Sequence, residues 1–258
     1  MTVQIENLSI SLGSTRLVHD VNLEVGNHER VGLIGASGSG KSLITKAVLG
    51  TLPRSMQVSG SIIIDGVNVL ELDDHDRAAM RGTYMTAIFQ NPLAALNPVH
   101  TVRKNVELPL TLHYTLNASQ RYERVVEALR SVGLEEHLAS RFPSELSGGQ
   151  AQRVAIAQAV VAHPQLLIAD EPTTAVDSIV QQQIIDVLVE RSEQQNLALI
   201  FASHDFSVIS RTANRCYVIN NGSVVDSGTL EELMNSSVEY TRKLIDAARS
   251  IAVRGLGE

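Results

Sequence analysis

The sequence predicts an α/β fold with a parallel core sheet. The short apolar runs 30–34, 165–169 and 198–202 have the length and composition of strands that are buried on both faces. Between the last two, residues 180–190 show helical spacing, with Ile184 and Leu188 on the inward side. Because strands that alternate with helices pair in parallel, we expect these segments to form the core.

The remaining segments predict two additions to this core. Val21, Leu23 and Val25 alternate with polar residues, which favours a half-buried, antiparallel N-terminal β region. From about 101 to 162 the pattern is mostly helical, with Asn117 and Gln120 as a capping pair. Shorter elements are expected as helices at 42–50 and from Asp73 or Asp74 to Met80, strands at 61–65 and 87–89, and a hairpin of 216–219 with 223–226. We therefore predict one domain over 1–258, an inserted helical subdomain at 101–162 and a helical tail at 227–258.

Composition excludes several classes of protein. Of the 258 residues, 44% are hydrophobic and 19% charged, which is an ordinary globular balance. A net charge of −7 and only 3% aromatic residues disfavour binding to nucleic acid. The single cysteine, Cys216, lies in a strand pattern and is expected to be a core residue. We see no signal peptide and no apolar run of ~20 residues, so a cytoplasmic chain that reaches the membrane through partners is expected.

A glycine-rich motif, Gly35-x-x-x-x-Gly40-Lys41-Ser42, follows the strand 30–34 and opens a helix. That context is typical of a loop whose backbone N–H groups surround nucleotide phosphates. Lys41 would reach the β- and γ-phosphates, and the Ser42 hydroxyl would ligate Mg²⁺. The predicted ATP-binding residues here are Gly35, Ala36, Ser37, Gly38, Ser39, Gly40, Lys41, Ser42 and Leu43.

Two carboxylates, Asp170 and Glu171, follow the apolar strand 165–169. Ligands bind at this end of strands in an open α/β sheet. An aspartate at the position of Asp170 can hold Mg²⁺, and Glu171 can orient or deprotonate a water that attacks the γ-phosphate.

A second glycine-rich segment, Leu146-Ser-Gly-Gly-Gln150, precedes a helix that is expected to begin near Gln150. Ser147 offers a hydroxyl, and Gly148 and Gly149 offer unhindered N–H groups. Together with the helix N-terminus they predict a second anion site.

These motifs, in this order, resemble the ATPase subunit of ABC transporters, a group of P-loop NTPases. The resemblance rests on Leu146–Gln150, on Gln152-Arg153 and on Asp170-Glu-Pro-Thr-Thr174, and it covers nearly the whole chain. It implies that Gln90 contacts Mg²⁺ and water and senses the permease. It also implies that Asp177 touches the opposite subunit and that His204 contacts the γ-phosphate.

The resemblance further implies an assembly. Ser147, Gly148, Gly149 and Gln150 of one chain would close over the ATP held by a second ATPase subunit, for which we favour a paralogue over a copy. Two integral membrane permeases and, through them, an extracellular solute-binding protein would complete it, with the chain peripheral on the cytoplasmic face of the membrane. Leu12 takes the place where the family usually stacks an aromatic ring on adenine; Val18 or a residue of a partner are the alternatives for that contact.

A narrower resemblance concerns the subfamily. Four segments resemble those of the ATPase subunits of importers of peptides, opines and nickel. They are Arg81-Gly82, Phe89–Pro98, Leu167–Thr174 and Glu239–Leu244. With one cysteine and an end at Glu258, no iron–sulfur cluster is expected, and the length is more similar to the nickel or metallophore branch. A soluble, non-transport complex, such as a phosphonate-degrading assembly, fits the motifs equally well; neighbouring genes would distinguish the two.

Overall fold

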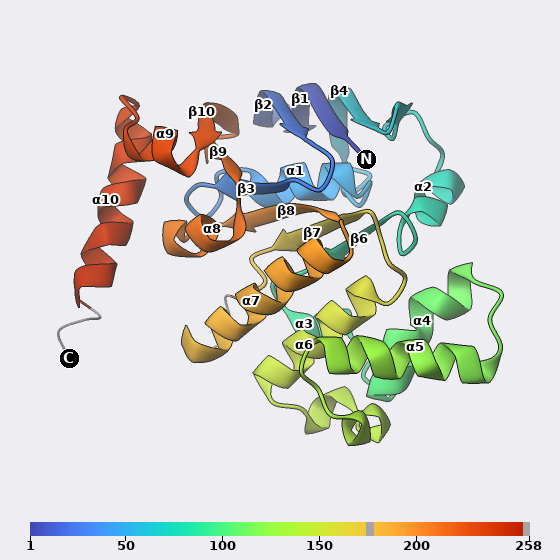
Figure 1. Cartoon of the computed structure of the whole chain (residues 1–258). Coiled ribbons are helices and arrows are strands. Elements are labelled where there is room, and N and C mark those ends of the chain that lie inside the picture. The colour runs from blue at the N-terminus through green and yellow to red at the C-terminus, as the bar shows by residue number, and fades with distance from the viewer. Residues whose placement is uncertain (174–177, 255–258) are drawn as a thin grey trace. The chain divides into compact units, whose positions relative to one another are not determined.

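The computed structural model describes residues 1–173 and 178–254, with the backbone alone for 249–254. The chain divides into two compact units. The first unit contains Met1–Leu72 and Ala198–Glu258, and the second contains Asp73–Leu197. The elements can be followed by their labels and colours in Figure 1.

An antiparallel sheet forms the N-terminal part of the first unit. Its strands run in the order β2-β1-β4-β5. Val3 of β1 lies between Val25 of β2 and Ile64 of β4, and all three side chains are buried. The predicted antiparallel pairing is confirmed. The strand bounds are β1 (Val3–Leu12), β2 (Thr15–Val25), β4 (Met56–Ile64) and β5 (Val67–Asn68).

Parallel strands form the core of the same unit, as predicted. β3 (Arg30–Ile34) lies between β8 (Ala198–Ser203) and β9 (Arg215–Asn220) and is parallel to both. β10 (Ser223–Thr229) returns antiparallel to β9 and is longer than the predicted 223–226. The helices are α1 (Lys41–Val48), α8 (Phe206–Thr212), α9 (Leu230–Met234) and α10 (Glu239–Arg254).

Cys216 lies in β9, and its side chain is fully buried. Burial raises the pKa of its thiol to about 12. Because the thiolate is the reactive form of cysteine, the raised pKa keeps this thiol unreactive. Its burial confirms the prediction that Cys216 is a core residue.

The second unit pairs two parallel strands, β6 (Met85–Ile88) and β7 (Leu166–Asp170), and every residue of β7 is buried. The helix predicted for 180–190 is α7 (Ser178–Gln194), which is longer than expected. The other helices are α2 (Asp74–Met80), α3 (Pro92–Ala95), α4 (Val102–His113), α5 (Ala118–Ser131), η1 (Glu136–Ser140), η2 (Pro143–Glu145) and α6 (Gly148–Val160).

Local sequence signals set the ends of these helices. The Asn117 side chain accepts from the Gln120 N–H at 3.0 Å, and the Gln120 side chain accepts from the Asn117 N–H at 2.9 Å, which is the predicted capping pair. Asp73 caps α2 in the same way through the N–H of Asp76. Gly133, at φ +69°, follows the end of α5.

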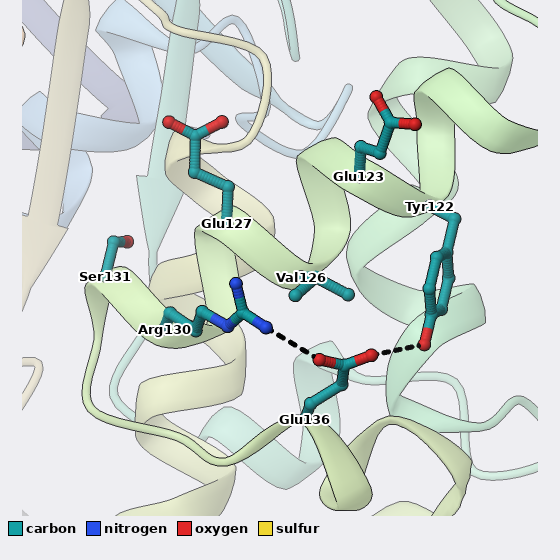
Figure 2. Close-up of a pocket in the computed structure, with 7 residues that line it drawn as sticks. All are labelled: Tyr122, Glu123, Val126, Glu127, Arg130, Ser131 and Glu136. Atoms are coloured by element: carbon teal, nitrogen blue, oxygen red, sulfur yellow. Dashed lines mark hydrogen bonds and ion pairs between the residues drawn. The ribbon is translucent and has the colours of Figure 1, made fainter.

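A hollow of about 630 Å³ lies beside α5 and η1 (Figure 2). At its edge the Glu136 carboxylate accepts hydrogen bonds from the Arg130 guanidinium and the Tyr122 hydroxyl, each at 2.8 Å. The hydrogen bond to Glu136 raises the pKa of Tyr122. None of the predicted site residues lines this hollow.

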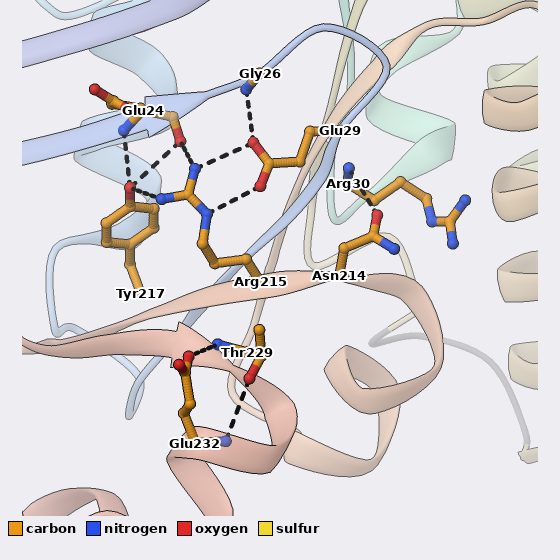
Figure 3. A network of polar contacts seen from close by, with 9 residues as sticks. All are labelled: Glu24, Gly26, Glu29, Arg30, Asn214, Arg215, Tyr217, Thr229 and Glu232. Atoms are coloured by element: carbon orange, nitrogen blue, oxygen red, sulfur yellow. Dashed lines mark hydrogen bonds and ion pairs between the residues drawn. The ribbon is translucent and has the colours of Figure 1, made fainter.

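A polar network centred on Arg215 fixes β9 beside β2 and β3 in the first unit (Figure 3). The guanidinium contacts both carboxylate oxygens of Glu29, at 2.9 and 3.1 Å. It also donates to the hydroxyl of Tyr217, which accepts from the Glu24 N–H at 2.9 Å. A two-point contact of this kind holds geometry as well as charge.

The network predicts an acid-sensitive step in stability. Partial burial raises the pKa of Glu29, but the hydrogen bond and charge of Arg215 and the N–H of Gly26 outweigh it and leave the pKa below its ordinary value of 4.5. The folded state therefore binds fewer protons than the unfolded state as the pH falls below about 4.5. The stabilising contribution is present above that pH and is lost as pH falls through the folded-state value.

We expect Glu29→Gln to show a shallower loss of unfolding free energy than the wild type when urea melts are compared from pH 6 down to the acid limit. If both proteins lose stability with the same slope below about pH 4.5, Glu29 does not carry this contribution.

Among the described residues, no helix combines the length and the apolar character that crossing a bilayer requires.

Candidate functional site

The phosphate loop predicted at Gly35–Ser42 joins β3 to α1. Gly38 and Gly40 take φ values of +78° and +111°, which side chains rarely adopt. A Cβ on Gly35 would lie 2.1 Å from the carbonyl oxygen of Ile219. Gly38 and Gly40 therefore require glycine for their backbone conformation, and Gly35 requires it because the loop lies directly against β9.

Lys41 lies inside the curve of this loop. Its side chain is buried, and its ammonium donates to the carbonyl oxygens of Gly35 at 2.7 Å and Ala36 at 3.0 Å. Ser42 follows in the first turn of α1, and its side chain is exposed. Gly40, the N-cap of α1, supplies no side-chain cap to the first turn. A curved backbone, a lysine and a helix N-terminus of this kind fit an anionic phosphate chain.

His204 leaves the parallel strands at the same edge as this loop. In the register of β3 and β8, Ile34 pairs with Ser203, so Gly35 and His204 each follow the carboxyl end of adjacent strands. His204 is exposed, and Asp205 behind it caps α8 by accepting from the N–H of Ser207 at 2.8 Å. The first unit thus places the phosphate loop and His204 together.

In the second unit, Gln90 and the two carboxylates share one strand edge. Ile88 of β6 pairs with Ala169 of β7, after which come Gln90 and Asp170-Glu171. Glu171 takes φ +49°, a left-handed conformation that costs free energy in a residue with a long side chain. Its Oε2 accepts from Gln90 Nε2 at 3.4 Å. Asp170 is buried at the end of β7.

The second glycine-rich segment begins α6 two residues earlier than expected. Ser147 is the N-cap, and its Oγ accepts from the Gln150 N–H at 3.2 Å while the Gln150 side chain accepts from the Ser147 N–H at 3.0 Å. The side chains of Ser147 and Gln150 thus close a capping box, which was not among the predicted roles of these residues. The hydroxyl proton of Ser147 and the N–H groups of Gly148 and Gly149 take no part in this capping box, and they are donors of the kind that an anion requires. A Cβ on Gly149 would lie 2.7 Å from Val180.

Two further residues with predicted roles at the site are Leu12 and Asp177. Leu12, predicted beside adenine, ends β1 with a side chain that is 47% exposed. Asp177 lies outside the described residues.

For Mg²⁺, the Ser42 hydroxyl, the Gln90 amide and the Asp170 carboxylate are hard oxygen donors of the kind this ion prefers. No cluster of three or more His, Cys, Asp or Glu side chains suited to a metal occurs in the described part of the chain.

Asn105, which no sequence pattern singled out, holds the loop 97–101 together. This buried side chain accepts from the Asn97 N–H at 2.7 Å and donates to the carbonyl oxygens of Asn97, His100 and Thr101. An asparagine inside a helix pattern carries no local signal for such a role, since its partners come from the preceding loop.

Comparison with known proteins places these observations in a family. The family description "ABC transporter" matches residues 18–174. The oligopeptide transport ATP-binding protein OppD of Lactococcus lactis is 36% identical over 89% of this chain and 69% of its own. The metal-staphylopine import system ATP-binding protein CntD of Staphylococcus aureus is 34% identical over 91% of this chain and 88% of its own. The chain spans about half the length, 46%, of the peptidoglycan transport ATP-binding protein YejF of Agrobacterium fabrum, at 37% identity.

Solved structures of ATP-binding cassettes have the same fold as this chain. A dimeric ATP-binding cassette in a post-hydrolysis state, bound to ADP and Pi, superposes with a TM-score of 0.79 at 31% identity, covering 88% of this chain and 98% of that one. The cbiO1 protein of Clostridium perfringens, part of an ABC transporter complex, gives a TM-score of 0.80 at 27% identity over 91% of this chain and 90% of its own.

The phosphate loop, the strand-end carboxylates and the capped glycine segment define a nucleotide-binding ATPase cassette of the α/β class. The chain belongs to the ABC transporter family and is an ATP-binding domain of it.

Proposed function

We propose that the chain is the ATP-hydrolysing subunit that powers a membrane importer for peptides, nickel or metal–chelate substrates such as metallophores. The observation that supports ATP hydrolysis most strongly is the hydrogen bond between Gln90 and Glu171. It orients the carboxylate of a residue that lies at the carboxyl end of a buried strand and has a strained backbone conformation. The similarity to proteins named for oligopeptide transport and metal-staphylopine import supports the substrate classes.

In this proposal each side chain has a defined role. Lys41 neutralises charge on the β- and γ-phosphates, and the glycines of the loop let backbone N–H groups reach them. Glu171 orients the attacking water and accepts its proton, while the Gln90 amide fixes the carboxylate. His204 contacts the γ-phosphate. Mg²⁺, for which Ser42, Gln90 and Asp170 are the proposed ligands, supplies positive charge to the phosphate oxygens.

We also propose that hydrolysis requires a second ATPase subunit, a paralogue in preference to a copy. Ser147, Gly148, Gly149 and Gln150 would cover the ATP held by that subunit, and Asp177 would touch it. ATP then joins the two subunits and hydrolysis separates them, and that motion drives the permeases. The similarity to a cassette solved as a dimer with ADP and Pi supports this arrangement.

A surface for the permeases is available in residues 89–99, the last of which lie in the loop that Asn105 holds. Phe89, Leu93 and Val99 are 38, 48 and 76% exposed, although each is large and apolar. Apolar side chains gathered in one exposed segment are typical of contact with another protein. We propose that this surface contacts a permease at the cytoplasmic face of the membrane, and that the two permeases of the assembly connect the chain to an extracellular solute-binding protein.

Isolation of the complex in mild detergent tests this function. We expect the tagged chain to recover two integral membrane proteins, and the double variant Leu93→Ser, Val99→Ser to recover them less well. Met234→Ser, which removes an apolar side chain that is 49% exposed on α9, is the control and should retain them. Recovery of soluble enzyme components, with no membrane protein, would instead support a non-transport assembly.

A further inference from the structure

We propose that Tyr240, in the first turn of α10, is a positioning residue for the phosphate loop and thereby sets the affinity for ATP. Its hydroxyl accepts a hydrogen bond from the backbone N–H of Ala36 at 3.1 Å, across 204 residues of sequence. Both residues belong to the same compact unit. The inference rests on the proposed role of Gly35–Ser42 as the ATP phosphate site.

Ala36 is the residue of the loop at which several contacts meet. Its carbonyl oxygen accepts from the Lys41 ammonium at 3.0 Å and from the Ser39 N–H at 3.1 Å. Its N–H is the group that Tyr240 holds. The tyrosine therefore fixes the orientation of the residue to which the phosphate-binding lysine is attached by a hydrogen bond.

The C-terminal segment is itself anchored where Tyr240 lies. The Asp226 carboxylate in β10 accepts from the hydroxyls of Ser236 and Thr241, and Thr241 is almost fully buried. The turn between β9 and β10 makes a second contact with the phosphate loop, since the Gly222 N–H donates to the Ser39 carbonyl at 2.8 Å. The loop is thus held at Ala36 and at Ser39 by parts of the chain that follow β9.

A loop that is already ordered loses less conformational entropy when it binds phosphate, so removing one of its supports should weaken binding. Tyr240→Phe deletes only the hydroxyl and keeps the ring in place. Loss of one neutral hydrogen bond corresponds to about a two- to tenfold change in an equilibrium constant. Because the support acts before and during the reaction alike, we expect KM for ATP to rise by that factor while kcat is kept.

Calorimetric titration of the full chain with MgATP, with steady-state ATPase assays beside it, tests the inference. We expect a higher Kd for Tyr240→Phe, and a change in the same direction for Thr241→Val, which loosens the anchor of α10. Tyr114→Phe is the matched control: its hydroxyl donates to the Ala162 carbonyl at 2.9 Å in the other unit, and its Kd should equal that of the wild type.

A double-mutant cycle distinguishes a specific contact from general loosening. Ala36→Pro removes the N–H, so Tyr240→Phe should add nothing in that background. An unchanged Kd for folded Tyr240→Phe, an equal effect of Tyr114→Phe, or a fall in kcat at constant KM would overturn the proposal. Lys41→Ala separates this failure from failure of the site: if it too leaves Kd unchanged, the loop is not the ATP site.

Discussion

Replacing Glu171 by Gln is expected to reduce ATP hydrolysis by about 10²–10⁴-fold while ATP binding is retained. The amide has almost the shape of the carboxylate, its oxygen can still accept the Gln90 hydrogen bond, and glutamine tolerates the left-handed backbone no worse than glutamate. The change therefore removes little except the base that accepts a proton from water. With hydrolysis blocked, the proposed pair of ATPase subunits should remain closed on ATP.

Phosphate release under saturating MgATP measures this effect, and Glu190→Gln is the matched control. Glu190 lies on α7 with a side chain that is 56% exposed, and its carboxylate contacts Arg191 and Gln194. It belongs to no proposed site, so its variant should hydrolyse ATP like the wild type. Hydrolysis at the wild-type rate by Glu171→Gln would exclude Glu171 as the base.

Lys41→Ala is expected to weaken MgATP binding by about 10- to 150-fold, the loss that a charge-assisted hydrogen bond of roughly 1.5–3 kcal/mol represents. The Lys41 ammonium already lies within the loop, and its two carbonyl partners show that it can reach the space enclosed by Gly35 and Ala36. Removing it takes away the positive charge that the proposed site directs at the β- and γ-phosphates.

The control for this variant is Lys46→Ala, at the other end of the same helix. Lys46 lies in the last turn of α1, where a positive charge interacts with the helix dipole by ~0.3–1 kcal/mol. We expect a small loss of stability and unchanged nucleotide affinity. Calorimetry on both variants decides the assignment, and equal affinities for Lys41→Ala and wild type would refute it.

Much of the fold could be predicted because it is encoded locally. The run 30–34 before Gly35 predicted a buried strand and a phosphate loop, since a glycine-rich turn between a strand and a helix has few other uses. Asn117 and Gln120 predicted a helix start, which the capping box confirms. Cys216 was expected in the core from its apolar neighbours alone, and it is fully buried.

The parts that could not be predicted depend on contacts between distant segments or on backbone conformation. No local pattern links Ala36 to Tyr240, and nothing around Glu171 indicates that its φ is +49°. Ser147 was interpreted through its glycine neighbours, whereas the structure also uses it as the N-cap of α6. The position of Gln90 was predicted from family resemblance, but its contact with Glu171 could be found only in the structure.

The role of Glu171 is tested most directly by the chemical identity of the nucleotide that Glu171→Gln retains after incubation with MgATP and rapid removal of free ligand. We expect intact ATP on Glu171→Gln, and ADP or no nucleotide on the wild type. Recovery of ADP from Glu171→Gln in the same amount as from the wild type would contradict that role.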